Sequence, residues 1–175
     1  GSQEIMQISN SLAKFYRLVL SKGNSLIPVR DELDMVKSFL QIQKIRFEDK
    51  FDVRYDVDES LSEEKIIKNL LQPIVENALN HGIDPKRSHG TIIIKVKQYN
   101  GKLIFKVIDD GVGMNAATLT EVISEKVERS SGSGYAIKNI IERLKAYYGA
   151  DYSFDIFSKP GIGTAVTIQI KTVEG

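Results

Sequence analysis

An acidic, glycine-rich segment after a β-rich run is the first candidate for ligand chemistry. Asp109 and Asp110 are followed by Gly111 and Gly113 within the sequence DDGVGM. A carboxylate at a strand end offers a hydrogen-bond acceptor, and the two glycines let a flat ligand approach the backbone closely. Glycine turns after strands are also common, so the same residues fit a simple tight turn. The DxGxG segment alone leaves both interpretations open.

A row of polar side chains, mostly amides, on a predicted helix ending at Gly82 is the second candidate. Its members recur at helical steps: Asn69, Gln72, Glu76, Asn77 and Asn80. Asparagine is a poor helix former, so a plain solvent-exposed face would more often carry Lys and Glu. Amide oxygens here could ligate a hard cation such as Mg²⁺, which shares oxygen ligands with phosphates. The alternative is an ordinary polar surface. Pro73 lies inside the pattern, so we expect the helix to kink or restart there.

The glycine-rich start of a later helix is the third candidate. Gly132, Ser133 and Gly134 precede an apolar periodic segment. Exposed N–H groups and the helix dipole favour anions at such a point, and glycines let a phosphate approach. A flexible loop with an ordinary cap is the alternative. The polar, weakly patterned residues 115–131 are typical of a mobile lid over a ligand.

Apolar periodicity predicts two helices at the start of the chain. Residues 5–19 carry one apolar stripe that stops at residues 22–24, and residues 33–47 continue the pattern on a second helix beginning near Arg30 or Asp31. Two antiparallel helices cannot bury both faces alone, so they need the following domain or a partner chain.

The spacing predicts two further helices around the candidate residues. Ser60 and Glu63 have the spacing of a capping box, and a helical pattern follows with core positions from Ile67 to Ala78. Apolar positions between residues 137 and 144 mark the last helix, which Gly149 closes.

Strands are predicted where apolar and polar residues alternate, at residues 51–57, 91–99, 102–109, 152–157 and 164–170. Asn100-Gly101 joins the second and third of these as a hairpin, because this pair suits a type I′ turn. Helices mixed with a largely antiparallel sheet indicate the α+β class.

Composition limits the classes of function. A formal net charge of +1 argues against a dedicated nucleic-acid binder. The absence of cysteine excludes disulfides and thiolate chemistry, and two histidines make a structural zinc site unexpected. No apolar run approaches the roughly 20 residues that a membrane span needs.

The order of these motifs resembles the GHKL ATPase superfamily of gyrase, heat-shock chaperone, histidine kinase and MutL proteins. Residues 71–83, LQPIVENALNHGI, are more specific and resemble the N box of LytS/YesM-type sensor histidine kinases. The stretch from DEL at residues 31–33 to QIQKIRF at residues 41–47 resembles the second helix of that subfamily's dimerisation region. IIERL at residues 140–144 also fits, and the likeness runs from about residue 5 to residue 170.

The resemblance implies a Bergerat fold, a two-layer α/β sandwich with a mixed sheet. Two helices of a dimerisation region would precede it in residues 1–49, and residues 50–175 would form the ATP-binding catalytic domain. Asn77 would coordinate the Mg²⁺ that bridges the phosphates of ATP, and Asp109 would accept from the adenine amino group.

The remaining site residues follow from the same resemblance. Gly111 and Gly113 would form the floor near the base. Asn80 and His81 would lie near the phosphates and the ribose respectively. The phosphates would be covered by a lid with these residues: Gly132, Gly134 and, as a phosphate contact, Lys138.

Two departures from the family pattern bear on activity. Hydrolysing members carry a glutamate four residues before the metal asparagine, where this chain has Pro73, which cannot accept a proton. This favours phosphoryl transfer to a side chain over free hydrolysis. The second glycine box usually reads GxGLxN, and here Ala136 replaces the second-box glycine, so the methyl is either tolerated or weakens ATP binding.

The resemblance also implies the setting of the domain. The acceptor histidine is expected upstream of residue 1, since neither His81 nor His89 lies in such a motif, so this chain should not autophosphorylate. A response regulator, a homodimer and a bacterial cytoplasmic location beside a membrane-anchoring part are expected. Two alternatives remain: an anti-sigma-type serine kinase, and a degenerate nucleotide-binding module that acts by dimerising or by docking a response regulator.

Overall fold

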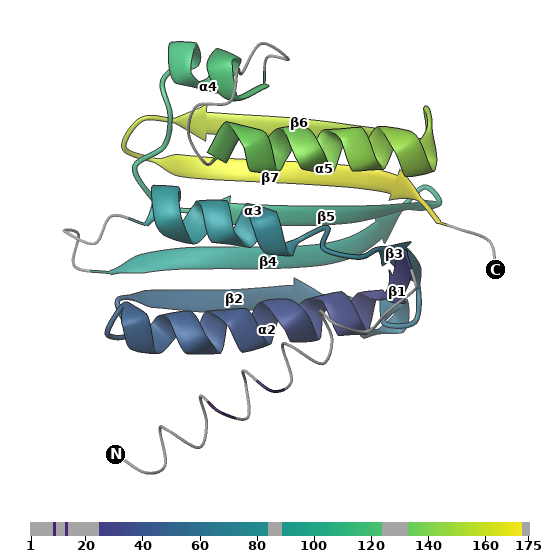
Figure 1. The fold of residues 1–175 in the computed structure, drawn as a ribbon, viewed down its shortest axis with the longest axis horizontal. Helices are drawn as coiled ribbons and strands as arrows, with labels where there is room; N and C mark the ends of the chain where they lie inside the picture. The colour runs from purple at the N-terminus through teal and green to yellow at the C-terminus, as the bar shows by residue number, and fades with distance from the viewer. Residues whose placement is uncertain (1–8, 10–12, 14–24, 84–88, 124–132, 173–175) are drawn as a thin grey trace.

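The computed structural model describes residues 25–83, 89–123 and 133–172, with isolated positions 9 and 13. Its centre is a five-stranded mixed sheet in the order β2-β4-β5-β7-β6 (Figure 1). The strands are β2 (Phe51–Val57), β4 (Gly90–Tyr99), β5 (Lys102–Asp109), β6 (Tyr152–Lys159) and β7 (Gly163–Lys171). Only the β2–β4 pair is parallel among these neighbours, so the predicted α+β class with a largely antiparallel sheet is confirmed.

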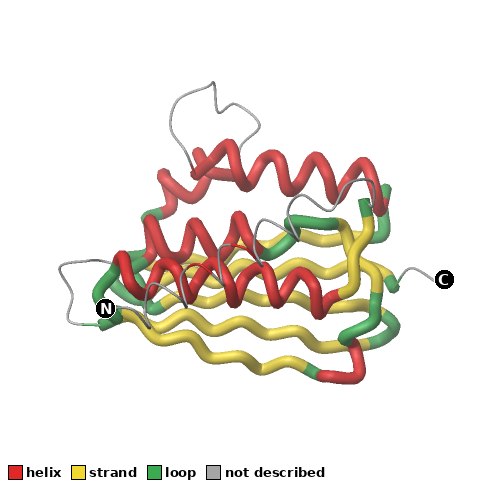
Figure 2. The backbone as a smooth tube through the Cα atoms, turned by 60° about the horizontal axis from the view of Figure 1, so that its bottom comes forward, coloured by secondary structure: helices red, strands yellow, loops and turns green. Residues whose placement is uncertain are grey.

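Helices cover one face of this sheet, which gives the two layers seen in Figure 2. They are α2 (Val29–Arg46), α3 (Gln72–Asn77) with the π-helical turn η2 (Ala78–Gly82), and α5 (Ser133–Tyr148). Every second residue of β5 is buried beneath them, which is the period expected of a sheet with one covered face.

Helix α2 packs into the same core as the sheet. Val29, Leu33, Val36 and Leu40 are buried together with apolar residues of α3, β4 and β5. The second predicted helix therefore buries its apolar stripe against the following domain. The first predicted helix, within residues 5–19, lies outside the described residues.

Two turns follow the sequence chemistry closely. Asn100 and Gly101 both have positive φ, 49° and 72°, as a type I′ turn requires. Gly149 has φ 60° and donates its amide to the carbonyl of Lys145, so it closes α5 as predicted.

The predicted helix starting at Ser60 is wrong over its first half. Residues Glu59–Leu61 form a short 3₁₀ turn, η1, and its start is capped by Asp58, which accepts from the amide of Ser60 at 3.0 Å. Lys65–Ile67 is strand β3, paired antiparallel with β1 (Leu26–Pro28). The helix begins only at Gln72, because Pro73 suits the first turn of a helix and not its interior. The expected kink or restart of a longer helix at Pro73 is therefore wrong, since no helix precedes Gln72 in this described segment and Pro73 lies in the first turn of α3.

A short helix, α4 (Ala116–Ile123), occupies part of the segment that the sequence pattern left without structure. Asn115 stabilises its start by accepting from the amide of Thr118 at 2.9 Å. In the described part of the chain, no helix is long and apolar enough to cross a membrane.

Candidate functional site

Asp109 ends strand β5 on the helix-covered face of the sheet. Its side chain is 5% exposed and its Oδ1 accepts from the amide of Gly111 at 3.0 Å. Burial raises the pKa of Asp109 to about 6, although amide hydrogen bonds from Gly111 and Thr164 act in the opposite direction. A buried carboxyl that retains acceptor capacity is suited to a donor group on a ligand.

The DxGxG turn packs directly against the end of the helical segment. The amide of Val112 donates to the carbonyl of Gly82 at 2.9 Å. A Cβ on Gly111 would lie far inside van der Waals contact with that same carbonyl, and a Cβ on Gly82 would lie 2.6 Å from Asp109 Oδ1. Glycine is therefore required on both sides of this contact, which fixes Asp109 relative to the helix.

Helix α3 and the turn η2 carry the amide and imidazole groups of the site. The amide of Ile83 donates to the carbonyl of Ala78, an i to i−5 bond that closes a wide π-helical turn. Such turns interrupt α-helices most often at functional sites. Asn77 and His81 are four residues apart, so they share one face of this segment.

Asn77 has an incompletely satisfied side chain. Its Nδ2 is buried and has no hydrogen-bond partner among the described residues. Burying an amide without a partner costs free energy, so an orphaned group in a pocket wall indicates a place for a ligand. An amide carries both a donor and an acceptor, and its oxygen is the kind of ligand that Mg²⁺ takes.

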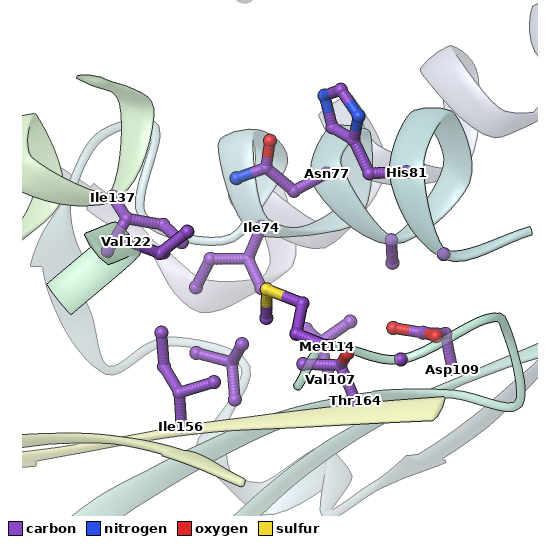
Figure 3. A pocket seen from close by; sticks show the side chains of 14 residues that line it. Ile74, Asn77, His81, Val107, Asp109, Met114, Val122, Ile137, Ile156 and Thr164 are labelled. Atoms are coloured by element: carbon purple, nitrogen blue, oxygen red, sulfur yellow. The ribbon is translucent and has the colours of Figure 1, made fainter. Parts of the chain in front are cut away.

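A pocket brings these groups together between the helices and the sheet. It encloses about 600 Å³, counting its open mouth. In Figure 3, Asn77 and His81 lie on the helical side, where the exposed imidazole of His81 points away from the sheet, while Asp109 lies on the sheet side and points into the pocket. The walls are mostly apolar, and the lining residues are Ile74, Asn77, Ala78, His81, Gly82, Val107, Asp109, Gly113, Met114, Val122, Ile137, Ile156, Thr164 and Val166. An apolar slot with a few polar groups at defined places is typical of a site for a flat organic ligand.

The structure gathers only part of the predicted set. Asn77, His81, Asp109 and Gly113 line the pocket, and Gly111 lies beside it under Gly82.

The other predicted residues are placed differently. Asn80 is exposed and Lys138 is half-buried on α5, and neither is among the lining residues. Gly134 belongs to the first turn of α5, which begins at Ser133 and not after the glycines. Gly132 lies outside the described residues.

Several lining residues were not singled out from the sequence. Val107 lies two positions before Asp109 on β5, so strand alternation alone would have placed it on the same face. Thr164 is the β7 partner of Asp109, a pairing that depends on the register between distant strands. Val122 comes from the unpredicted helix α4.

Metal ligands are few in the described part of the chain. Within the described ranges no cluster of three or more His, Asp or Glu side chains could hold a metal ion.

Two family models match the chain. Residues 62–174 match the "Histidine kinase-, DNA gyrase B-, and HSP90-like ATPase" family, and residues 1–51 match the "Histidine kinase" family.

Curated proteins similar to the chain include YwpD and several sensor proteins. The chain is 31% identical to YwpD of Bacillus subtilis over 98% of its own length and 60% of that protein. It is 28% identical to the sensor protein LytS of Enterococcus faecalis, over 97% of this chain and 29% of LytS. It is 29% identical to the sensor histidine kinase YesM of B. subtilis, over 96% of this chain and 28% of YesM. The chain thus spans less than two thirds of each of these relatives.

Solved structures share the fold. The histidine kinase domain of the Erythrobacter litoralis EL346 blue-light activated kinase matches with a TM-score of 0.60 at 16% identity, covering 95% of this chain and 74% of that one. Full-length ShkA in complex with AMPPNP matches with a TM-score of 0.61 at 19% identity, and the match covers 99% of this chain and 37% of ShkA. On the evidence of the match over residues 62–174, the chain belongs to the histidine kinase-, DNA gyrase B- and HSP90-like (GHKL) ATPase family, and over nearly its whole length it is similar to sensor histidine kinases of the LytS/YesM type.

Proposed function

We propose that this domain binds Mg-ATP in the pocket and transfers the γ-phosphoryl group to a histidine of a longer protein. The observation that carries the proposal is the meeting of a buried acceptor, Asp109, with the unpartnered amide of Asn77 in one largely apolar slot. The family match to an ATPase supports the nucleotide, and the similarity to sensor kinases supports the acceptor.

Asp109 would recognise the base. The adenine amino group is a donor, and an ionised carboxylate accepts from it without competition. Guanine carries a carbonyl oxygen at the equivalent position, so two acceptors would face each other in a buried site. Apolar side chains such as Ile74, Met114 and Ile137 would enclose the ring.

Asn77 would hold the metal end of the nucleotide, with His81 on the ribose side and Asn80 toward the phosphates. Gly134 and Lys138, on the first turns of α5, would lie on the phosphate side as the family resemblance implies. Bound Mg²⁺ would neutralise charge on the β- and γ-phosphates. Asn77 would orient this end of the substrate, and the apolar walls of the pocket would exclude water from around the base.

The chain offers no general base at the position where hydrolysing relatives carry one, because Pro73 occupies it. Transfer to a side chain is therefore favoured over transfer to water. We place residues 1–49 in the dimerisation region and residues 50–175 in the catalytic domain. The full-length protein would dimerise, donate its phosphoryl group to a response regulator, and work in the bacterial cytoplasm next to its membrane-anchoring part.

Calorimetric titration with a non-hydrolysable ATP analogue tests the proposal. We expect saturable binding that Mg²⁺ strengthens, that GTP does not reproduce and that Asp109→Asn abolishes. Asp155→Asn, at an exposed position of β6, is the matched control and should bind like the wild type. Absence of binding at millimolar nucleotide would refute the proposal and favour a degenerate module that acts through protein contacts.

A further inference from the structure

The turn that precedes α3 is held by side chains from two other helices. Asn69 lies in this turn with φ 56°, a left-handed conformation that asparagine adopts more readily than most residues other than glycine. Leu71, at the start of α3, follows it and makes no side-chain cap of its own. Something outside the segment must therefore satisfy its free amides and maintain its shape.

Glu32 of α2 supplies that missing cap. Its carboxylate is 0% exposed and accepts from the amides of Asn69 and Leu71, each at 2.8 Å, and of Gln72 at 3.4 Å. Burial raises the pKa of Glu32, while these amide bonds act in the opposite direction. A buried carboxylate is tolerated only when such bonds compensate for its lost hydration. Its negative charge also suits the N-terminus of a helix.

Arg143 of α5 binds the carbonyl groups of the same turn. Its guanidinium donates to the carbonyl of Asn69 at 3.1 Å and to the carbonyl of Lys68. The amides of the turn are thus bound by an anion from one helix, and its carbonyls by a cation from another. Arg143 itself is exposed, so its role does not depend on filling the core.

This clamp lies at the far end of the short helix that carries Asn77. Helix α3 has six residues, so at 1.5 Å per residue its start lies only about 8 Å from Asn77. A change in the position or angle of the helix start is passed on to Asn77 over this distance. Asp109 is fixed separately, by the sheet and by the contact of its turn with Gly82.

We propose that Glu32 and Arg143 are positioning residues that hold the start of α3 and thereby present Asn77 to the metal end of the nucleotide. Glu32 lies in the segment matched by the "Histidine kinase" model, whereas the turn and α3 lie in the segment matched by the ATPase model. The Glu32 carboxylate therefore links the position of α2 to the position of Asn77 at the metal end of the site. It has no such link to Asp109 at the adenine end. The inference rests on the proposed binding of Mg-ATP.

Two variants with matched controls test the inference. Glu32→Gln keeps the shape but removes the charge and turns an N–H donor toward amides, and Glu48→Gln is the control at an exposed glutamate. Arg143→Gln removes the guanidinium, and Arg54→Gln is the control at an exposed arginine of β2. The measurements are the affinities for a non-hydrolysable ATP analogue with and without Mg²⁺, and for adenosine.

We expect Glu32→Gln to weaken the Mg²⁺-dependent affinity about tenfold, since charge-assisted hydrogen bonds are lost. Arg143→Gln should weaken it by a smaller factor, and both variants should bind adenosine like the wild type. Equal losses for adenosine and for the Mg²⁺ complex would indicate general damage and overturn the inference, as would unchanged affinity in both variants. If Glu32→Gln fails to fold, the Arg143→Gln variant provides the test, because Arg143 is exposed. A Mg²⁺ dependence of affinity equal to that of the wild type in Arg143→Gln would then overturn the inference.

Amide hydrogen exchange gives a readout that needs no nucleotide. Residues 69–77 should exchange faster in Glu32→Gln and Arg143→Gln than in their controls. Unchanged exchange would overturn the positioning role even if ATP binds. Faster exchange in a protein that binds no nucleotide would support the clamp and refute the proposed function alone.

Discussion

Lowering the pH should weaken adenine binding through Asp109 before it unfolds the domain. The amino group of adenine is a donor, so it needs the ionised carboxylate. The pKa of Asp109 is raised to about 6 by burial. With this value, about one tenth of the molecules carry the ionised form at pH 5 and nearly all carry it at pH 8. Affinity for the base should therefore fall about tenfold between pH 8 and pH 5.

Adenosine is the suitable ligand for this measurement, because it has no phosphates that titrate in the same range. Titration followed by NMR between pH 5 and 8 would give the affinity at each pH, and a parallel thermal melt would show that the domain stays folded. Asp109→Asn is the control, and it should not bind adenosine at any pH in this range. A flat profile in the wild type, or an affinity that rises as the pH falls, would refute the assignment of Asp109 as the acceptor.

The same raised pKa has a consequence for stability with a definite sign. In the unfolded chain the carboxyl has an ordinary pKa near 3.8, below its folded value. The folded protein therefore holds this proton more tightly than the unfolded chain does. The resulting contribution to the free energy of unfolding is fully present below about pH 4 and is lost as the pH rises through about 6. At pH 7, Asp109→Asn should be more stable than the wild type by roughly 1–3 kcal/mol in urea denaturation, while losing the nucleotide. A less stable variant would mean that the carboxylate contributes to folding more than its burial costs.

Three further substitutions test the glycine segments. Gly111→Ala should lower the free energy of unfolding by about 3 kcal/mol or more, because its methyl would collide with the Gly82 backbone. Gly101→Ala is the control, because a Cβ there meets open space and only the positive φ is unfavourable, so its free energy of unfolding should fall by about 1 kcal/mol. If urea denaturation shows the same decrease for Gly111→Ala and Gly101→Ala, the proposed collision is contradicted. Ala136→Gly lies inside α5 and should cost about 1 kcal/mol of stability while changing ATP-analogue affinity by less than about threefold. A tenfold gain in calorimetry would show that the Ala136 methyl obstructs the phosphates.

Local chemistry in the sequence determined much of this fold. Asn100-Gly101 between two alternating runs requires a hairpin, and an apolar stripe that ends before Gly149 requires a helix. The family resemblance implied that Asn77, His81, Asp109 and Gly113 belong to one site, and all four residues line one pocket. In these cases the signal lies within a few neighbouring residues, because turns, caps and periodic faces depend on local backbone geometry.

Only the tertiary structure decided the segment between β2 and α3. Ile66 and Ile67 fit the apolar face of a helix in sequence, but they form a strand because Leu26 and Ile27 pair with them from a distant part of the chain. A short apolar run satisfies either periodicity, so long-range pairing settles it. The buried Glu32 has the same cause. Its partners are backbone amides of residues 69, 71 and 72, and backbone groups carry no sequence signal by which a side chain far along the chain could be matched to them.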